Sequence, residues 1–222
     1  MSHFVLVPSP LLGDAVWEPV ATELRRSGHA VTVAALDRSV RSPRHVVEAV
    51  RAALPDEPVV LVPHSNAGLS APLVAEDGRV EATVFVDAAL PPADAREVTM
   101  ASASFVEFLT AKADADGVLP VWTQWWDEDL TPLFPDATTR ELVERQQRRL
   151  PLAYFTEPMP VPHDWSARPS AYLAFGDTYA DELAFARARG WPVRVLAGLH
   201  LEMLQQPARV ADEVRRLAAT VL

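Results

Sequence analysis

Short, continuous hydrophobic runs recur along the chain, and longer stretches in which apolar positions follow helical spacing lie between them. The runs are rich in valine and other residues that favour strands. Their nearly unbroken apolar character is typical of strands that are buried on both faces of a sheet. The predicted strands are Phe4–Val7, Val31–Leu36, Val59–Val62, Ala82–Asp87, Ala171–Phe175 and Val193–Ala197.

Amphipathic stretches between these runs predict helices. Two of them are followed directly by a glycine, which commonly ends a helix in a left-handed conformation. The alternation of strands and helices predicts an α/β fold, in which one parallel sheet carries helices on both faces and the crossovers are right-handed. The predicted helices are Val16–Ser27, Pro43–Leu54, Gly68–Glu76, Asp181–Arg189 and Pro207–Leu222.

This alternation is interrupted once, between the runs that end at Asp87 and begin at Ala171. A structureless loop of about 80 residues would be improbable in a compact domain, and the segment contains helical patches, many prolines and the aromatic cluster "VWTQWW". We expect a small helical cap over residues 93–168, inserted into a core formed by residues 1–92 and 169–222. The aromatic side chains are expected to pack the cap and, as a group, are candidates to line a substrate pocket. They are Trp122, Trp125, Trp126, Phe134 and Phe155.

Composition and net charge limit the kind of protein that this fold can be. A chain of 222 residues, 49% of them hydrophobic, is long enough to form one sizeable domain with its own core. The absence of cysteine excludes disulfides, thiolate metal sites and cysteine nucleophiles. A net charge of -10 argues against binding to nucleic acid or to an anionic membrane surface. The N-terminus shows neither a signal peptide nor a membrane span, so we expect a cytoplasmic protein whose partner is a small-molecule substrate.

The sequence "VVLVPHSNAG" places Ser65 at a sharp break between a predicted strand and a predicted helix. Serine is common at turns and at helix starts, so the residue by itself is explained by local structure. The alternative is a nucleophile held on a tight strand-to-helix elbow, for which the usual pattern is G-x-S-x-G. Here Pro63 and Ala67 replace the two glycines, and Gly68 follows one position later.

A serine nucleophile needs an imidazole to take its proton. His200 lies just after the last predicted strand and just before the C-terminal helix, where a loop at the carboxyl edge of the sheet could bring it over Ser65. His29, His45 and His163 lack such a placement and are expected to be surface or structural residues. His64 adjoins Ser65 and, as its immediate neighbour, is expected to point elsewhere.

The strands, the serine elbow and the late histidine follow one another in an order that resembles the α/β-hydrolases, in particular their compact esterase and hydroxynitrile-lyase-like branch. The matching segments are "FVLVPSPLLGDAVWEPVATELRRSGHAVTVAALD", "VVLVPHSNAG", "VFVDAALP" and "YLAFGD...GWPVRVLAGLHLEML", which cover nearly all of the chain outside the expected cap. The resemblance implies a core of about six strands that lacks the first two strands of larger members. It also implies that Ser65 is the nucleophile and His200 its base.

The resemblance further implies a carboxylate that orients the histidine, usually on the turn after the strand "AYLAF". That turn reads "GDTYADE", and Asp177 is the closest match to the usual place. Asp181 and Glu182 lie within one helical turn of it, and for these two a charge at a helix N-terminus is the simpler explanation. Asp87, at the end of an earlier strand, is the remaining candidate.

The oxyanion hole is where the sequence departs from its relatives. One donor is expected to be the backbone N–H of Asn66, and the other usually comes from the loop after the first strand. That loop reads "PSPLLG" here, and Pro10, at or beside the donor position, has no N–H. Either the Leu11 N–H or the Ser9 hydroxyl replaces it, or the hole is incomplete.

These residues predict a serine hydrolase that cleaves an ester or thioester of a small, largely apolar compound through an acyl-enzyme on Ser65. Two alternatives use the same scaffold: lyase or cyclase chemistry with His200 as a base and no acyl intermediate, and a ligand-binding protein with vestigial site residues. The fold alone does not choose among them. No cluster of histidines and carboxylates has ligand spacing and no glycine-rich phosphate loop follows a strand, so we expect neither a metal nor an organic cofactor.

Overall fold

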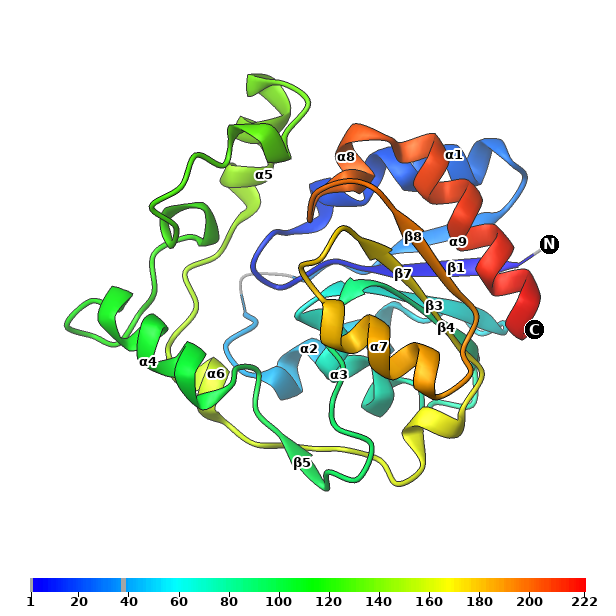
Figure 1. The fold of residues 1–222 in the computed structure, drawn as a ribbon, viewed down its shortest axis with the longest axis horizontal. Helices are drawn as coiled ribbons and strands as arrows, with labels where there is room; N and C mark the ends of the chain where they lie inside the picture. The colour runs from blue at the N-terminus through cyan, green and yellow to red at the C-terminus, as the bar shows by residue number, and fades with distance from the viewer. Residues whose placement is uncertain (1, 37–38) are drawn as a thin grey trace.

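The computed structural model describes residues 2–36 and 39–222, and at its centre lies a six-stranded parallel sheet of order β2-β1-β3-β4-β7-β8 (Figure 1). This is the predicted α/β architecture, and each strand overlaps a predicted hydrophobic run. The strands are β1 His3–Val7, β2 Ala30–Val33, β3 Val59–Ser65, β4 Val80–Ala88, β7 Ser170–Phe175 and β8 Val193–Leu196.

Burial of the strands follows their place in the sheet. Strands β3 and β7 are buried at every position, and β1 and β4 at nearly every position, whereas the edge strands β2 and β8 are largely half-buried or exposed. Valine and other apolar residues fill the inner strands because both faces of these strands contact helices.

Helices cover both faces of the sheet (Figure 1). On one face α1 packs against α9, and on the other face α2 packs against α3, with α7 beside them. The predicted helix over residues 16–27 begins with a short 3₁₀ turn at Asp14–Val16 and continues as α1, whose second residue is Pro19. Their bounds are α1 Glu18–Arg26, α2 Pro43–Ala53, α3 Ala67–Val74, α7 Ala180–Ala188 and α9 Pro207–Val221.

In the segment between β4 and β7, helices α4, α5 and α6 lie beyond the carboxyl ends of the strands, on the left in Figure 1, whereas β5 lies at the bottom of that view. Its two ends are joined by a small antiparallel sheet, in which Glu97 pairs with Pro160 and Val98 with Met159. The predicted boundaries at residues 93 and 168 stay a prediction. The elements of the segment are β5 Glu97–Val98, α4 Ala103–Lys112, α5 Ala137–Gln146, α6 Ala153–Thr156 and β6 Met159–Pro160, with 3₁₀ turns at Trp122–Gln124, Thr131–Leu133 and Trp165–Ala167.

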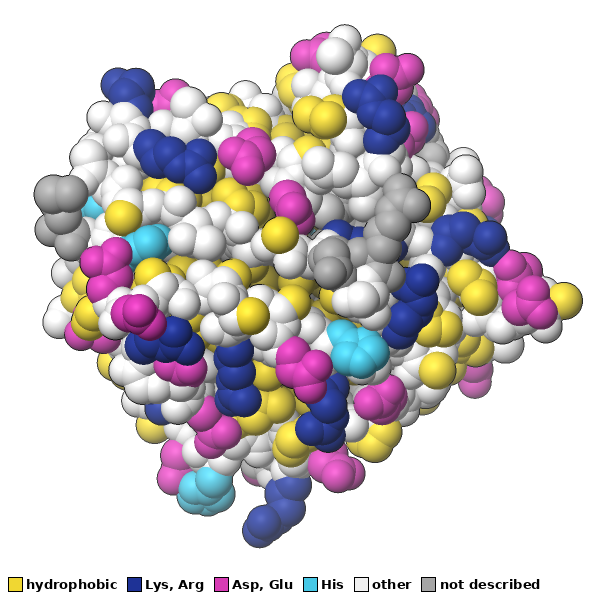
Figure 2. Space-filling model, turned by 180° about the vertical axis from the view of Figure 1, so that it is seen from behind, with side chains coloured by type: hydrophobic (Ala, Val, Ile, Leu, Met, Phe, Trp, Pro, Cys, Tyr) yellow, Lys and Arg dark blue, Asp and Glu magenta, His cyan; other side chains and the backbone are white. Residues whose placement is uncertain are grey.

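The surface carries charges of both signs. Figure 2 shows basic and acidic side chains interspersed over the rear face of the molecule. Some ion pairs of the structure form within one helix, such as Arg26 with Glu23 and Arg140 with Glu144. Within residues 2–36 and 39–222, no helix is long and apolar enough to cross a membrane.

Candidate active site

Ser65 is the last residue of β3 and lies on a tight turn into α3. Its backbone φ is 57°, in the left-handed region that non-glycine residues rarely adopt. The turn is held by a hydrogen bond from the Ala89 N–H to the Ser65 carbonyl, of 3.1 Å. Gly68 is required one step later, because a Cβ there would lie 2.2 Å from the carbonyl oxygen of Ala89. The "PHSNAG" sequence therefore builds the strained elbow that a nucleophile needs, with its glycine displaced by one position.

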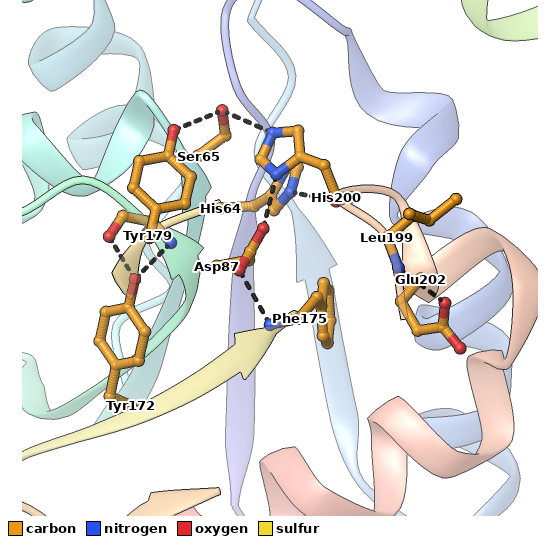
Figure 3. A network of polar contacts seen from close by, with 10 residues as sticks. His64, Ser65, Asp87, Tyr172, Phe175, Tyr179, Leu199, His200 and Glu202 are labelled. Carbon is orange, nitrogen blue, oxygen red and sulfur yellow. Dashed lines mark hydrogen bonds and ion pairs between the residues drawn. The ribbon is translucent and has the colours of Figure 1, made fainter. Parts of the chain in front are cut away.

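His200 reaches Ser65 from the loop after β8. Its Nε2 lies 3.1 Å from Ser65 Oγ (Figure 3). The loop is fixed by the buried Glu202, whose Oε2 accepts a hydrogen bond of 3.3 Å from the Leu199 N–H. Gly198 leaves room for this carboxylate, since a Cβ there would lie 2.3 Å from Glu202 Oε2. Glu202 thus helps to hold the loop that carries His200.

Asp87 is the carboxylate that contacts His200. Its Oδ2 lies 2.7 Å from His200 Nδ1, and its Oδ1 accepts a hydrogen bond of 2.8 Å from the Phe175 N–H. Asp87 is fully buried near the end of β4. Just beyond it, the Tyr172 hydroxyl accepts from the Ala88 N–H and donates to the Ala88 carbonyl, which fixes the end of the strand.

The prediction that Asp177 is the carboxylate beside His200 is therefore wrong. Asp87, the remaining candidate from the sequence, makes this contact. Asp177 is exposed on the turn after β7. In the part of the chain that the structure describes, no hydrogen bond or ion pair joins His200 to Asp177, Asp181 or Glu182, and Asp87 is the carboxylate paired with it. The reason is the strand order, since β4 lies next to β3 and Ala88 pairs with Ser65, whereas β7 is one strand further away.

The three side chains form one chain of hydrogen bonds. The Asp87 carboxylate can only accept, so His200 Nδ1 carries the proton that it donates. The lone pair of His200 Nε2 then faces the Ser65 hydroxyl. This arrangement is suited to removing the serine proton.

His64 supports His200 from the opposite side. The two imidazole rings are stacked with centroids 4.6 Å apart, and His64 Nε2 donates to the His200 carbonyl oxygen over 3.1 Å. Burial and the neighbouring His200 hold the pKa of His64 well below its ordinary value, so His64 stays neutral. The sequence did not identify this role, because the contact depends on where a distant loop returns.

Tyr179 is a second residue that the sequence did not identify. Its hydroxyl lies 3.4 Å from Ser65 Oγ, and its ring lies 5.7 Å from the ring of His200. The residue belongs to the turn "GDTYADE", the same turn that contains Asp177, Asp181 and Glu182. Burial raises the pKa of the Tyr179 phenol above its ordinary value.

The loop after β1 folds onto itself beside the site. Ser9 is fully buried, and its carbonyl accepts hydrogen bonds from the N–H groups of Leu12 and Gly13. The Leu11 N–H points at the Ser9 hydroxyl oxygen over a long distance of 3.4 Å. Pro10 has no N–H to offer. The oxyanion roles of the Ser9 hydroxyl and the Leu11 N–H stay predictions.

Asn66 is held by the inserted segment. Its side-chain amide donates to the Met100 carbonyl over 2.9 Å and accepts from the Tyr154 hydroxyl over 2.9 Å. Its backbone φ of -58° places it at the entry to α3. Both ends of the side-chain amide are therefore occupied by hydrogen bonds to the inserted segment. The backbone N–H is the group of Asn66 that is left for the predicted oxyanion role.

The three tryptophans predicted to contact substrate differ in position. The ring of Trp122 lies 6.2 Å from the ring of His200. Trp126 packs against Trp122 and Phe105, and Trp125 packs against Trp126 and Phe105. Trp125 is fully buried, and Trp122 is nearly so. Trp122 is the one that the structure brings beside the histidine.

No group of three or more histidines and carboxylates is arranged to hold a metal ion anywhere in residues 2–36 and 39–222.

The chain is similar in sequence to two esterases over part of its length. No protein-family model matches the chain. The chain is 36% identical over 105 residues to esterase PIR7B of Oryza sativa subsp. japonica, a match that covers 40% of this chain and 39% of that protein. It is 32% identical over 104 residues to polyneuridine aldehyde esterase of Rauvolfia serpentina, with the same coverage. The match therefore spans about two fifths of the length of each relative.

Solved structures match over the whole chain. Polyneuridine aldehyde esterase superposes with a TM-score of 0.75 at 21% identity, covering 98% of this chain and 99% of that one. An extracellular α/β-hydrolase from a Paenibacillus species has a TM-score of 0.75 at 17% identity, with the same coverage. Tomato methylketone synthase I has a TM-score of 0.75 at 19% identity, covering 100% of this chain and 99% of that one. The chain has the α/β-hydrolase fold and is similar to its esterase-like branch.

Proposed function

We propose that this protein is a serine hydrolase that cleaves an ester or thioester of a small, largely apolar compound through an acyl-enzyme on Ser65. The observation that carries the proposal is the chain of hydrogen bonds from Ser65 Oγ through His200 to Asp87, of 3.1 and 2.7 Å. The similarity to two esterases supports the same class of reaction.

Acylation begins when His200 Nε2 takes the proton of Ser65 as Oγ attacks the acyl carbon. Asp87 holds the imidazole in the required tautomer and stabilises its positive charge. The stacked His64, which is neutral, adds no like charge against the imidazolium. His200 then returns the proton to the leaving oxygen or sulfur.

Deacylation repeats these roles with water as the nucleophile. His200 Nε2 takes a proton from water as its oxygen attacks the acyl carbon, and gives that proton to Ser65 Oγ as the serine departs. The Asn66 N–H and either the Ser9 hydroxyl or the Leu11 N–H stabilise the oxyanion in both halves.

The surroundings support a small, apolar substrate. Ser65 is only 6% exposed, and the nearly buried Trp122 lies beside His200. A site enclosed by aromatic side chains favours apolar groups and excludes bulky, charged ones. We therefore assign Trp122 to the wall of the substrate pocket, with Trp126 packed against it and Trp125 packed against Trp126.

A second function is favoured by one observation, the proline in the oxyanion loop. If Pro10 leaves the hole incomplete, His200 and Asp87 could act as an acid–base pair in lyase or cyclase chemistry without an acyl-enzyme. The two functions differ in their need for Ser65 as a nucleophile.

Fluorophosphonate labelling with peptide mapping tests the proposal, because the reagent reacts with an activated serine. We expect wild-type protein to be modified at Ser65 and the Ser65→Ala and His200→Ala variants to remain unmodified. Turnover of a p-nitrophenyl ester should fall by several orders of magnitude in both variants. An unlabelled wild-type protein, or a Ser65→Ala variant that keeps its turnover, would favour the acid–base function instead.

A further inference from the structure

The turn after β7 brings a phenol, rather than a carboxylate, to the nucleophile. Tyr179 comes directly before α7, and Figure 3 shows it and His200 approaching the Ser65 hydroxyl from two sides. Within the described residues, Ser65 Oγ at 3.4 Å is the only hydrogen-bond partner of the Tyr179 hydroxyl. Neither the acylation nor the deacylation steps proposed for Ser65 and His200 use this hydroxyl.

The direction of this hydrogen bond follows from counting protons. The Ser65 hydroxyl has one proton, and the unprotonated Nε2 of His200 at 3.1 Å is the acceptor for it. Ser65 Oγ can therefore only accept from Tyr179, and the phenol must be the donor. Burial raises the pKa of this phenol, so that Tyr179 keeps its proton at neutral pH.

We propose that Tyr179 is a catalytic residue that donates a hydrogen bond to Ser65 Oγ whenever this oxygen carries negative charge. The inference rests on the proposed acyl-enzyme mechanism. A distance of 3.4 Å is long for a hydrogen bond between two hydroxyl groups. Hydrogen bonds to charged oxygen are shorter and stronger, and contacts of this kind tighten as the reaction proceeds.

The hydrogen bond acts in opposite senses in the two halves of the reaction. In acylation the bond from Oγ to the acyl carbon forms and the bond to the leaving oxygen breaks, and the donor both stabilises Oγ and lowers its reactivity. In deacylation the bond from water oxygen forms and the bond to Oγ breaks, so that Oγ is the leaving group. Tyr179 keeps its own proton throughout. The hydrogen bond from Tyr179 therefore accelerates deacylation and has little net effect on the rate of acylation.

The substitution Tyr179→Phe isolates the hydroxyl, because phenylalanine retains the ring beside His200. Thr178→Val is a matched control that removes an exposed hydroxyl from the same turn. Both variants and the wild type are mixed rapidly with p-nitrophenyl acetate, and release of p-nitrophenol is followed before and during the steady state.

We expect Tyr179→Phe to lower kcat by about ten- to hundredfold, which is the range for a hydrogen bond to a charged group. KM should fall with it, because acyl-enzyme accumulates, so that kcat/KM changes little. A burst approaching one equivalent of p-nitrophenol should precede the slow phase. Thr178→Val should match the wild type.

Three results would overturn the role of Tyr179: wild-type kinetics in Tyr179→Phe, a rise in KM at unchanged kcat, or a loss of kcat/KM without a burst. The first leaves the hydroxyl without a function, the second makes it a substrate contact, and the third makes it structural. Fluorophosphonate labelling of the wild type separates these results from failure of the mechanism. A labelled wild type confines the failure to Tyr179, whereas an unlabelled one removes the acyl-enzyme itself.

Discussion

Replacing Asp87 by Asn changes one oxygen to an amide and tests how the site controls the tautomer of His200. Asp87 accepts two hydrogen bonds, from the Phe175 N–H at 2.8 Å and from His200 Nδ1 at 2.7 Å. The Phe175 N–H is a fixed donor, so the oxygen of the asparagine must face it. The amide NH₂ then faces His200 Nδ1, which must become the acceptor, and the proton moves to Nε2. His200 then presents a proton, rather than a lone pair, to Ser65.

A wrong tautomer of this kind costs about 10⁴-fold in kcat in a serine protease, which corresponds to roughly 5.5 kcal/mol of transition-state stabilisation. The assay is steady-state turnover of a p-nitrophenyl ester, with circular dichroism to show that the variant is folded. Asp177→Asn is the matched control, because Asp177 is exposed and lies on the neighbouring turn. Near wild-type turnover in Asp87→Asn, or a large loss in Asp177→Asn, would refute this reasoning.

Three further predictions concern the elbow and its surroundings. Ser9→Ala should lower kcat about a hundredfold with little change in KM, as loss of an oxyanion donor does; steady-state kinetics measure it. Gly68→Ala should destabilise the fold by about 3 kcal/mol in urea denaturation, because its Cβ would lie 2.2 Å from a backbone oxygen. The stability of the wild type should fall with pH below about 6.5, because His64 is held neutral when folded and gains a proton when unfolded.

Each of these predictions has a control. Wild-type kinetics in Ser9→Ala would leave the Leu11 N–H as the donor. Gly78→Ala has open space around the added Cβ and should be nearly neutral, so equal effects at both glycines would contradict the steric explanation. His64→Gln keeps a donor for the His200 carbonyl but cannot titrate. If its melting temperature falls as steeply as that of the wild type between pH 7 and 5, His64 is not the group responsible.

The fold and the pair of Ser65 and His200 could be predicted because the signals for them are local. A buried parallel strand is a continuous apolar run, and a helix shows its period within a few turns. The elbow is likewise contained in six consecutive residues, "PHSNAG". A single histidine after the last strand could be assigned to the carboxyl edge, because all strands of a parallel sheet end there.

The partners of that pair were decided only by the tertiary structure. Asp87 and Asp177 both follow strands, and choosing between them requires the order in which β4 and β7 lie beside β3. The contacts of His64 and Tyr179 can be known only from the path of loops that are distant in sequence. His64 is separated from His200 by 136 residues, and Tyr179 from Ser65 by 114 residues. Hydrophobic periodicity reports which face of an element is buried, but it carries no information on which element lies next to it. A hydrogen bond depends on distances within a few tenths of an ångström, and packing alone sets those distances.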